Sequence, residues 1–392
     1  MNLIDLQSGI REKNSYIAEL ESIRGIAVIL VFFFHLYGMT ISGAKIKPDS
    51  YSLPMSFIAG GNTGVTLFFV LSGFLLSLPF IKGSQRGQLP SVRDYFISRT
   101  LRILPLYYIV VVTSIIINGN LDNGIAALSF QYVGFDIFPF SVVWWTLSTE
   151  VQFYILLPLV MLLSSTRNGK LILLILLIVW AVAYYLLTLS NYPLDNSYEV
   201  IRTKSIFARL PAFIFGIAAA FIYSLNDTKV AKSSKNQRLY SSFALVILVL
   251  ALGLILQTAL SMGAAAEIEW HIHHSFEALC WGLILLLFVS TNPIGKSIFI
   301  NNMNAFLGKI SYSIYLLHVP IMFYIIYPIQ QTVGVENYIG SVEVIFASNL
   351  SIIATVVASY ISYQLIEKPF LKLKQHIPVF RKPTANISTK SN

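Results

Sequence analysis

Cysteine and charge are both scarce in this chain of 392 residues. It has a single cysteine, Cys280, which excludes an intramolecular disulfide framework and a cysteine-based metal site. Charged residues make up only 11% of the chain, whereas a soluble globular domain carries roughly 25%. This is too little charge to cover the surface of a soluble fold of this length. The composition therefore indicates an integral membrane protein.

Hydrophobic residues take the place of the missing charge. They make up 56% of the chain, and the mean hydropathy is +0.70. We expect no cleavable signal, because residues 1–22 are polar and the first long apolar run contains Arg24 and His35. A net charge of +9 would favour nucleic acid as a partner of a soluble protein. In a membrane protein it is typical of basic cytoplasmic loops, so no nucleic-acid partner is expected.

Apolar runs of about 20 residues, long enough to cross a bilayer as a helix, occur ten times. The expected spans are 23–40, 62–81, 101–118, 143–164, 170–190, 206–225, 241–260, 276–291, 303–327 and 343–366. Glu367-Lys368-Pro369 is expected to end the last helix, because the position before a proline disfavours helix. The sequence thus predicts an all-α fold, a polytopic transmembrane bundle in residues 1–372 with a short basic tail at 373–392.

Lysine and arginine are distributed unevenly between the two sides of these spans. Twenty-two of the 27 basic residues fall on one side, and the other side has only Lys45, Lys47, Arg202, Lys204 and Arg209. Basic loops stay in the cytoplasm, so both termini are predicted to be cytoplasmic. The intervening segment 119–142 is too long and too apolar for a plain loop. It is predicted to be a re-entrant or interfacial piece on the outer face.

Three ionisable residues stand out inside the expected spans, where a functional role is the first hypothesis. They are His35, Glu150 and His318. His35 follows Arg24 by eleven residues, which places both on one helix face about 16 Å apart. The structural alternative is that Arg24 extends to the lipid headgroups and His35 bonds a neighbouring helix.

The other two residues also have polar neighbours in the sequence. Glu150 is expected about two turns inside its span, at a depth compatible with contact to His35. His318 shares a helix face with Ser311 and Tyr315. Polar contacts between helices, with no catalytic role, remain the alternative for both.

A histidine-rich run at 271–274, His-Ile-His-His, contains residue types that bind metals. It lacks the ligand spacing of a metal site, and it falls on a predicted outer loop. We therefore expect a solvated surface there and no metal.

A pair of arginines lies at the predicted cytoplasmic mouth of the third span. Arg99 and Arg102 are one helical turn apart, so their forked donors could clamp a phosphate group. The alternative is ordinary positive charge on the cytoplasmic side.

Six sequence motifs occur in a fixed order along the chain. They are LESIRGIA at 20–27 followed by His35, GVTLFFVLSGFLL at 64–76, RTLRILPLY at 99–107, WTLSTEVQFY at 145–154, SYSIYLLH at 311–318 and EKP at 367–369. Together, over roughly residues 17–372, they resemble the acyltransferase-3 family of bacterial membrane proteins, which O-acylate sugars and other hydroxyl compounds. In the first motif Glu21-Ser22-Ile23 stands where the family more often has Asp-Gly-Leu, which keeps the acidic charge.

The resemblance implies a multi-pass O-acyltransferase of the bacterial cytoplasmic (inner) membrane. The donor would be cytoplasmic acyl-CoA, with acetyl as the expected acyl group. The acceptor would be a sugar-containing compound, free or lipid-linked, such as a cell-surface polysaccharide or lipopolysaccharide. The implied site residues are His35 and Glu150 for catalysis, Arg24, Arg99 and Arg102 for coenzyme A, and Trp145, Tyr154, Tyr315 and His318 for the acceptor.

The mechanism predicted from these roles is general-base catalysis by His35. Its neutral imidazole would remove the acceptor's hydroxyl proton as the oxygen attacks the thioester carbonyl. Glu150 would orient His35, stabilise its imidazolium or bind the sugar. A transient acyl group on His35 remains open.

Two other classes of function compete with this one. A transporter or flippase for a lipid-linked glycan explains ten spans and buried polar residues equally well. It predicts matching halves with broken helices, which the sequence does not show, and it leaves the arginine pair unexplained. A structural membrane scaffold does not explain His35 and Glu150 inside the spans.

Overall fold

The computed structural model describes residues 17–41, 50–189, 200–201, 203–225, 234–262 and 270–373, and all regular structure in these ranges is helical. Ten of the helices are long and apolar enough to cross a membrane. They are α1 (Ala18–Ile41), α3 (Thr63–Gln85), α4 (Val92–Asn118), α6 (Trp144–Ser164), α7 (Arg167–Leu189), α9 (Ile206–Leu225), α10 (Lys235–Met262), α12 (Trp270–Ser290), α15 (Ser311–Val333) and α17 (Val342–Ser362). The predicted all-α, multi-pass membrane fold is confirmed. Of the predicted tail at 373–392, Leu373 ends a helix and residues 374–392 lie outside the described residues.

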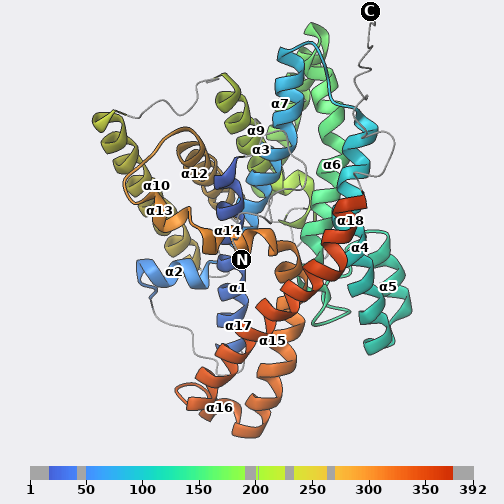
Figure 1. Cartoon of the computed structure of the whole chain (residues 1–392), viewed down its shortest axis with the longest axis vertical. Coiled ribbons are helices and arrows are strands. Elements are labelled where there is room, and N and C mark those ends of the chain that lie inside the picture. Colours follow the sequence, from blue (N-terminus) through green and yellow to red (C-terminus); the bar gives the residue numbers. More distant parts are fainter. Residues whose placement is uncertain are drawn as a thin grey trace, which may run out of the picture.

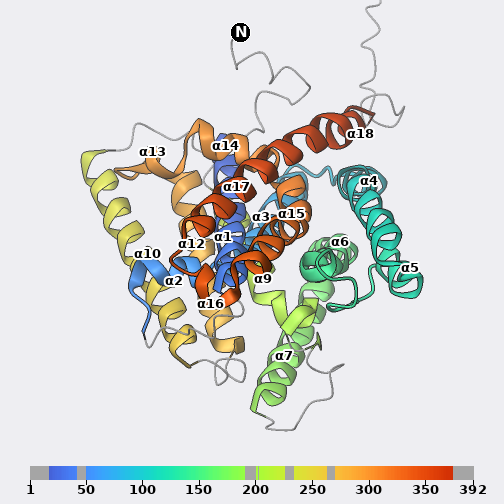
Figure 2. The same cartoon turned by 90° about the horizontal axis from the view of Figure 1, so that it is seen from below.

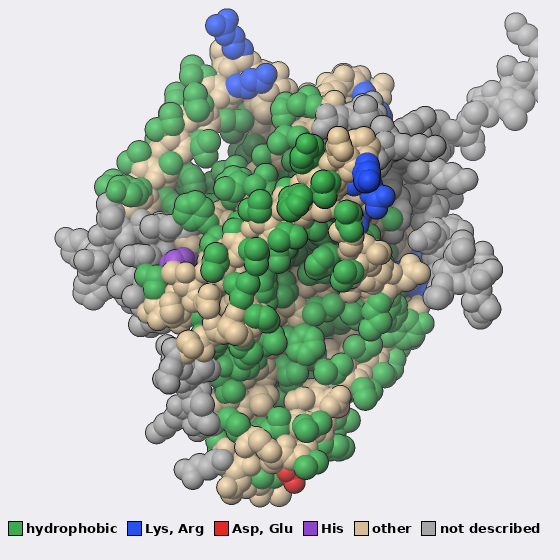
Figure 3. Space-filling view, turned by 90° about the vertical axis from the view of Figure 1, so that its left-hand side faces the viewer, with side chains coloured by type: hydrophobic (Ala, Val, Ile, Leu, Met, Phe, Trp, Pro, Cys, Tyr) green, Lys and Arg blue, Asp and Glu red, His purple; other side chains and the backbone are tan. Residues whose placement is uncertain are grey.

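The long helices form a central group and an outer group (Figure 1). Seen from below, α1, α3, α9, α12 and α15 lie in the middle, with α10, α7 and α4 around them (Figure 2). Burial follows this arrangement. In the most apolar stretch of each helix, 72% of the residues of α3 are buried but only 11% of those of α7. Hydrophobic side chains dominate the face shown in Figure 3. Apolar side chains on the outside of a bundle suit contact with lipid.

The third span begins nine residues earlier than the sequence analysis placed it. The hydroxyl of Ser91 accepts a hydrogen bond from the backbone N–H of Asp94 at 3.3 Å, which caps the first turn of α4. Asp94 also suits the positive end of the helix dipole. As a result, Arg99 and Arg102 lie inside α4 rather than at its mouth, and their side chains turn toward the bundle interior.

The last helix does not end at Pro369, which corrects the sequence prediction. After α17 the chain makes a π-helical turn (Tyr363–Glu367) and continues as α18 (Lys368–Leu373). A proline is tolerated in the first turn of a helix, where its missing N–H has no intrahelical partner to lose. Glu367 is buried in the turn and accepts a hydrogen bond from Ser313 of α15. The terminal motif therefore fixes α17 against α15.

The ninth expected span is divided into two helices. A short helix α14 (Asn302–Lys309) precedes α15. Like α18, four further helices in the described residues are short, α2 (Leu53–Ala59), α5 (Leu121–Leu128), α13 (Lys296–Phe299) and α16 (Val335–Tyr338). Asn301 caps α14 by accepting from the N–H of Asn304 at 2.9 Å. Because of this cap, a separate helix begins at Asn302. This helix, α14, packs against α1.

The segment between α4 and α6 packs back on α4. It contains α5 and ends in a short 3-10 turn, η2 (Ser141–Val143). Tyr107 of α4 donates to the carbonyl of Ala127 at 2.8 Å, and its ring stacks on Phe130 at 4.8 Å. The segment is thus ordered against α4, while its placement on the outer face stays a prediction.

Glycines allow α3 and α9 to approach closely. A Cβ added at Gly73 would collide with the backbone of Phe213, and one added at Gly216 would collide with the carbonyl oxygen of Val70. Small residues of this kind bring helix backbones together in membranes. Since α3 supplies one wall of the site described below, the close approach positions that wall.

The first prediction compares two helical glycines. We expect Gly216→Ala to destabilise the fold by about 1–3 kcal/mol, because the added methyl overpacks the α3–α9 contact. Gly38→Ala is the matched control, since a Cβ at Gly38 meets nothing within 4 Å and alanine favours helix. The measurement is the unfolding temperature of both purified variants in detergent. Equal unfolding temperatures would show that the contact is not tight.

Candidate active site

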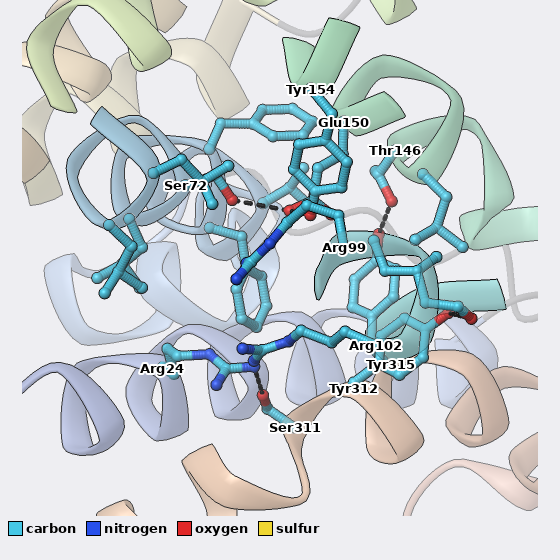
Figure 4. Close-up of a pocket in the computed structure, with 18 residues that line it drawn as sticks. Arg24, Ser72, Arg99, Arg102, Thr146, Glu150, Tyr154, Ser311, Tyr312 and Tyr315 are labelled. Carbon is cyan, nitrogen blue, oxygen red and sulfur yellow. Dashed lines mark hydrogen bonds between the residues drawn. The ribbon is translucent and has the colours of Figure 1, made fainter. Parts of the chain in front are cut away.

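Five helices enclose a cavity of about 90 Å³ in the centre of the bundle. α1, α3, α4, α6 and α15 each contribute to its wall. The labelled side chains in Figure 4 are its polar lining, namely Arg24, Ser72, Arg99, Arg102, Thr146, Glu150, Tyr154, Ser311, Tyr312 and Tyr315. Residues more than 280 positions apart in the sequence thus share one polar wall.

Three arginines give part of this wall a strong positive charge. Arg24 donates to the hydroxyl of Ser311 at 3.0 Å and lies 3.5 Å from the carboxylate of Glu21. Arg102 is near enough to Arg24 for their charges to repel each other (Figure 4). The Nε of Arg99 is buried and has no hydrogen-bond partner among the residues that the structure describes. Like charges held together with an unused buried donor are suited to an anionic ligand.

Glu150 provides the acidic group of the cavity. One oxygen of its carboxylate accepts from Ser72 at 2.8 Å and from Tyr154 at 2.6 Å. Tyr154 is one helical turn along α6, and Ser72 comes from α3. The carboxylate is therefore fixed toward the cavity (Figure 4).

Tyr315 forms the far wall of the cavity. Its hydroxyl is 2.8 Å from that of Thr146, which joins α15 to α6. Its ring lies 6.0 Å from the ring of His318, measured between centroids. His318, one of the two predicted histidines, therefore lies next to a residue of the cavity wall.

His35 and His318 contact each other. The Nε2 of His318 is 3.1 Å from the Nδ1 of His35, and the ring centroids are 4.9 Å apart. Arg24 and His35 share one face of α1, as the eleven-residue spacing predicted, and that face meets α15, because Arg24 contacts Ser311 and His35 contacts His318. Neither histidine lines the cavity.

The structure does not bear out the predicted contact between Glu150 and His35. Within the described residues, the hydrogen bonds of Glu150 go to Ser72 and Tyr154, and the side chain of His35 bonds Val31 and His318. The sequence analysis paired the two residues because they lie at a similar depth in the membrane. Depth does not determine which neighbouring helix a residue faces. The described residues also hold no group of three or more potential metal ligands.

A second polar cluster was missed by the sequence analysis. Arg209 of α9 and His274 of α12 are both buried, and Arg209 lies 3.2 Å from the Nδ1 of His274. Thr66 of α3 lies 3.2 Å from that nitrogen and donates to Glu277 at 3.2 Å. The sequence analysis had placed Arg209 among loop charges and 271–274 on a solvated face. The burial of Arg209 contradicts the first prediction, and the burial of His274 contradicts the second at that residue. The signal was the spacing of His274 and Glu277 on one helix face.

This cluster also determines the surroundings of Trp145. The guanidinium of Arg209 lies 4.9 Å from the centroid of the Trp145 ring, so that face of the indole is already covered. Phe69, a cavity residue, packs edge-on against the same indole at 6.3 Å. Trp145 thus links the second cluster to the cavity wall and is not itself a lining residue.

Comparison with known proteins decides the family. The profile described as an acyltransferase domain, the acyltransferase-3 family, matches residues 17–364. The chain belongs to the acyltransferase-3 family. No solved structure matches it. This family membership makes the protein an acyltransferase and favours acyl transfer over the transport alternative.

The relatives of this acyltransferase-3 protein are distant. ORF330 of Acidianus two-tailed virus, which is named as an acetyltransferase, is 26% identical over 86% of this chain and 90% of its own length. A protein of Staphylococcus aureus strain COL that is named as an O-acetyltransferase is 25% identical over 92% of this chain. The O-acetyltransferase OatA of S. aureus strain NCTC 8325 is 25% identical over 91%. The chain spans only 58% and 57% of the length of these two staphylococcal relatives.

The second prediction concerns the Arg209 cluster. We expect Arg209→Ala to destabilise the acyltransferase by about 1–3 kcal/mol, because it leaves the carbonyl of Thr203 without its donor and removes the cover of Trp145. Arg238→Ala is the control, since Arg238 is exposed at the start of α10. Unfolding temperatures in detergent test this. If both variants unfold at the wild-type temperature, the cluster does not stabilise the fold.

Proposed function

We propose that this protein transfers an acetyl group from acetyl-CoA to a hydroxyl of a sugar-containing acceptor at the bacterial cytoplasmic membrane. The observation that carries the proposal is the cavity with Arg24, Arg99 and Arg102 at one side and the histidine pair beyond Tyr315. The family supplies the reaction class, acyl transfer. The donor is inferred from the chemistry of the wall, and the acceptor from the motif resemblance and the relatives.

The arginines are the proposed binding site of the coenzyme A phosphates. Arginine binds phosphate through paired, charge-assisted hydrogen bonds. Arg24 already has Ser311 and Glu21 as partners, which leaves Arg99 and Arg102 as the principal phosphate ligands. By the predicted orientation this side of the cavity faces the cytoplasm, where acyl-CoA is found.

The size and shape of the cavity favour a narrow ligand. A pocket that encloses a drug-sized molecule measures roughly 300–1,000 Å³, so 90 Å³ can take only a slim part of the donor. The extended arm that carries the thioester has that form. Arg24 and His35 are about 16 Å apart along α1, so a linear donor could contact both. Such an arm would pass Tyr315 before it reaches His35.

The proposed chemistry is a direct transfer with His35 as general base. The imidazole takes the proton of the acceptor hydroxyl while the oxygen attacks the thioester carbonyl. The tetrahedral intermediate then expels the coenzyme A thiolate, which receives the proton from the imidazolium. Atoms and charge balance without a metal or another reactant. Glu150 lies in the cavity away from His35, so its proposed role is to bind substrate and balance the arginines.

The acceptor is proposed to be a cell-surface polysaccharide or lipopolysaccharide, or a lipid-linked precursor of one. Support comes from the motif resemblance and from the O-acetyltransferase name of OatA. Tyr154 and Tyr315 line the cavity, with their hydroxyls bonded to Glu150 and Thr146, and are the proposed polar contacts on this protein's side. Trp145 contributes by supporting the wall rather than by stacking on a sugar, because Arg209 covers one face of its ring and Trp145 does not line the cavity.

The third prediction tests the donor site by calorimetry. The double variant Arg99→Ala/Arg102→Ala should weaken acetyl-CoA binding by at least about 100-fold, because hydrogen bonds to charged groups contribute roughly 1.5–3 kcal/mol each. Arg86→Ala/Arg93→Ala removes the same charge from exposed positions nearby and should bind like the wild type. If both double variants lose the same affinity for acetyl-CoA, the cavity arginines contribute only general electrostatic attraction and are not specific phosphate ligands.

The fourth prediction tests the base. His35→Ala should lower acetyl transfer about 100- to 10,000-fold, the usual contribution of a general base. Acetyl-CoA binding should persist, because His35 is outside the arginine wall. The assay follows labelled acetyl from acetyl-CoA into envelope carbohydrate, in membranes of cells that naturally make this chain. Wild-type transfer by the variant would remove His35 from the mechanism.

A further inference from the structure

The hydrogen bonds of His318 determine where its proton lies. Its Nδ1 is 2.9 Å from the carbonyl oxygen of Ile314 and 2.9 Å from that of Tyr315. A carbonyl oxygen can only accept, so Nδ1 must carry the hydrogen. In a neutral imidazole the other nitrogen then has the lone pair. The Nε2 of His318 is therefore a hydrogen-bond acceptor, and it is the atom directed at His35.

The same reasoning fixes the proton of His35. Its Nδ1 is 2.9 Å from the carbonyl oxygen of Val31, one turn earlier on α1, and 3.1 Å from the Nε2 of His318. Both neighbours are acceptors, so Nδ1 of His35 carries the hydrogen and shares it between them. The lone pair of His35 is left on Nε2. With both rings neutral, this is the one proton arrangement that satisfies every contact.

We propose that His318 is a positioning residue that holds His35 in the base-competent tautomer. The proposal rests on the proposed role of His35 as general base. His318 would act as the carboxylate does in a serine-protease triad, by accepting the Nδ1–H and stabilising the imidazolium that forms. It differs in being a neutral acceptor.

A neutral acceptor suits the place where the pair lies. His318 is fully buried, in contact with the ring of Phe32, and His35 packs edge-on against Phe34. An ionised carboxylate in such apolar surroundings loses its hydration, whereas a neutral imidazole loses far less. The hydrogen bond can therefore form without a second buried charge while the enzyme is at rest.

This role replaces the acceptor contact that the sequence analysis gave to His318. Both of its ring nitrogens already have protein partners, and none of its surface is exposed. A purely structural role, joining α1 to α15, is the competing explanation. Gln330 provides a control for that role. It is buried on α15 and donates to the carbonyl of Met39 on α1 at 2.9 Å, away from the histidines.

The fifth prediction compares three variants in the labelled-acetyl assay. His318→Leu removes the acceptor and should lower the maximal rate about 10- to 100-fold, the usual range for a hydrogen bond to a charged group, while the KM for acetyl-CoA stays within about twofold. His318→Gln can place a carbonyl oxygen near the lost Nε2 and should restore most of the rate. Gln330→Leu should leave both constants near those of the wild type.

Several outcomes would overturn the positioning role. One is a His318→Leu rate equal to the wild type, and another is an equal loss in the Leu and Gln variants when both are folded and bind acetyl-CoA. If instead His35→Ala retains transfer, the proposed function itself fails. Nitrogen-15 NMR of histidine-labelled wild-type protein gives a check that needs no variant. Hydrogen on Nδ1 of both rings is expected, and hydrogen on Nε2 of neutral His35 would refute the assignment.

Discussion

The contact between α1 and α15 is the interaction on which the site depends. Three polar bonds follow it along the helix pair, from Arg24 to Ser311, from His35 to His318 and from Gln330 to the carbonyl of Met39. A polar group in a membrane interior must find a partner inside the protein, because lipid offers none. The same requirement that stabilises the helix pair therefore fixes the arginine and the histidine relative to each other.

Two separate polar regions surround the centre of the bundle. The arginine-lined cavity has an unused donor at Arg99 and a carboxylate at Glu150, whereas the Arg209–His274 cluster bonds largely within itself. Buried charge in a membrane protein can thus serve a ligand in one place and helix packing in another. The two regions differ in the hydrogen-bond partners of their charged side chains. Residue type does not separate them, because both contain arginine and glutamate.

Neutral histidine as a partner for histidine has a physical advantage in this setting. A buried carboxylate would need compensation throughout the catalytic cycle, whereas His318 carries no charge at any step of the proposed transfer. Glu150, the acidic residue of the cavity lining, shares that lining with three arginines that compensate its charge. Charge is therefore grouped where an anionic donor would bind, and the proposed base stands in neutral surroundings.

The sequence by itself determined the membrane class, the ten spans, the family motifs and the shared face of Arg24 and His35, because composition and helical periodicity are local properties. It did not reveal that Ser91 starts α4 early, that α17 continues past Pro369, or that Arg209 and His274 are buried together. Nor did it find the partner of His35, since depth suggested Glu150 whereas the structure shows His318. Only the tertiary structure decided these points, because they depend on which helix faces which across hundreds of residues.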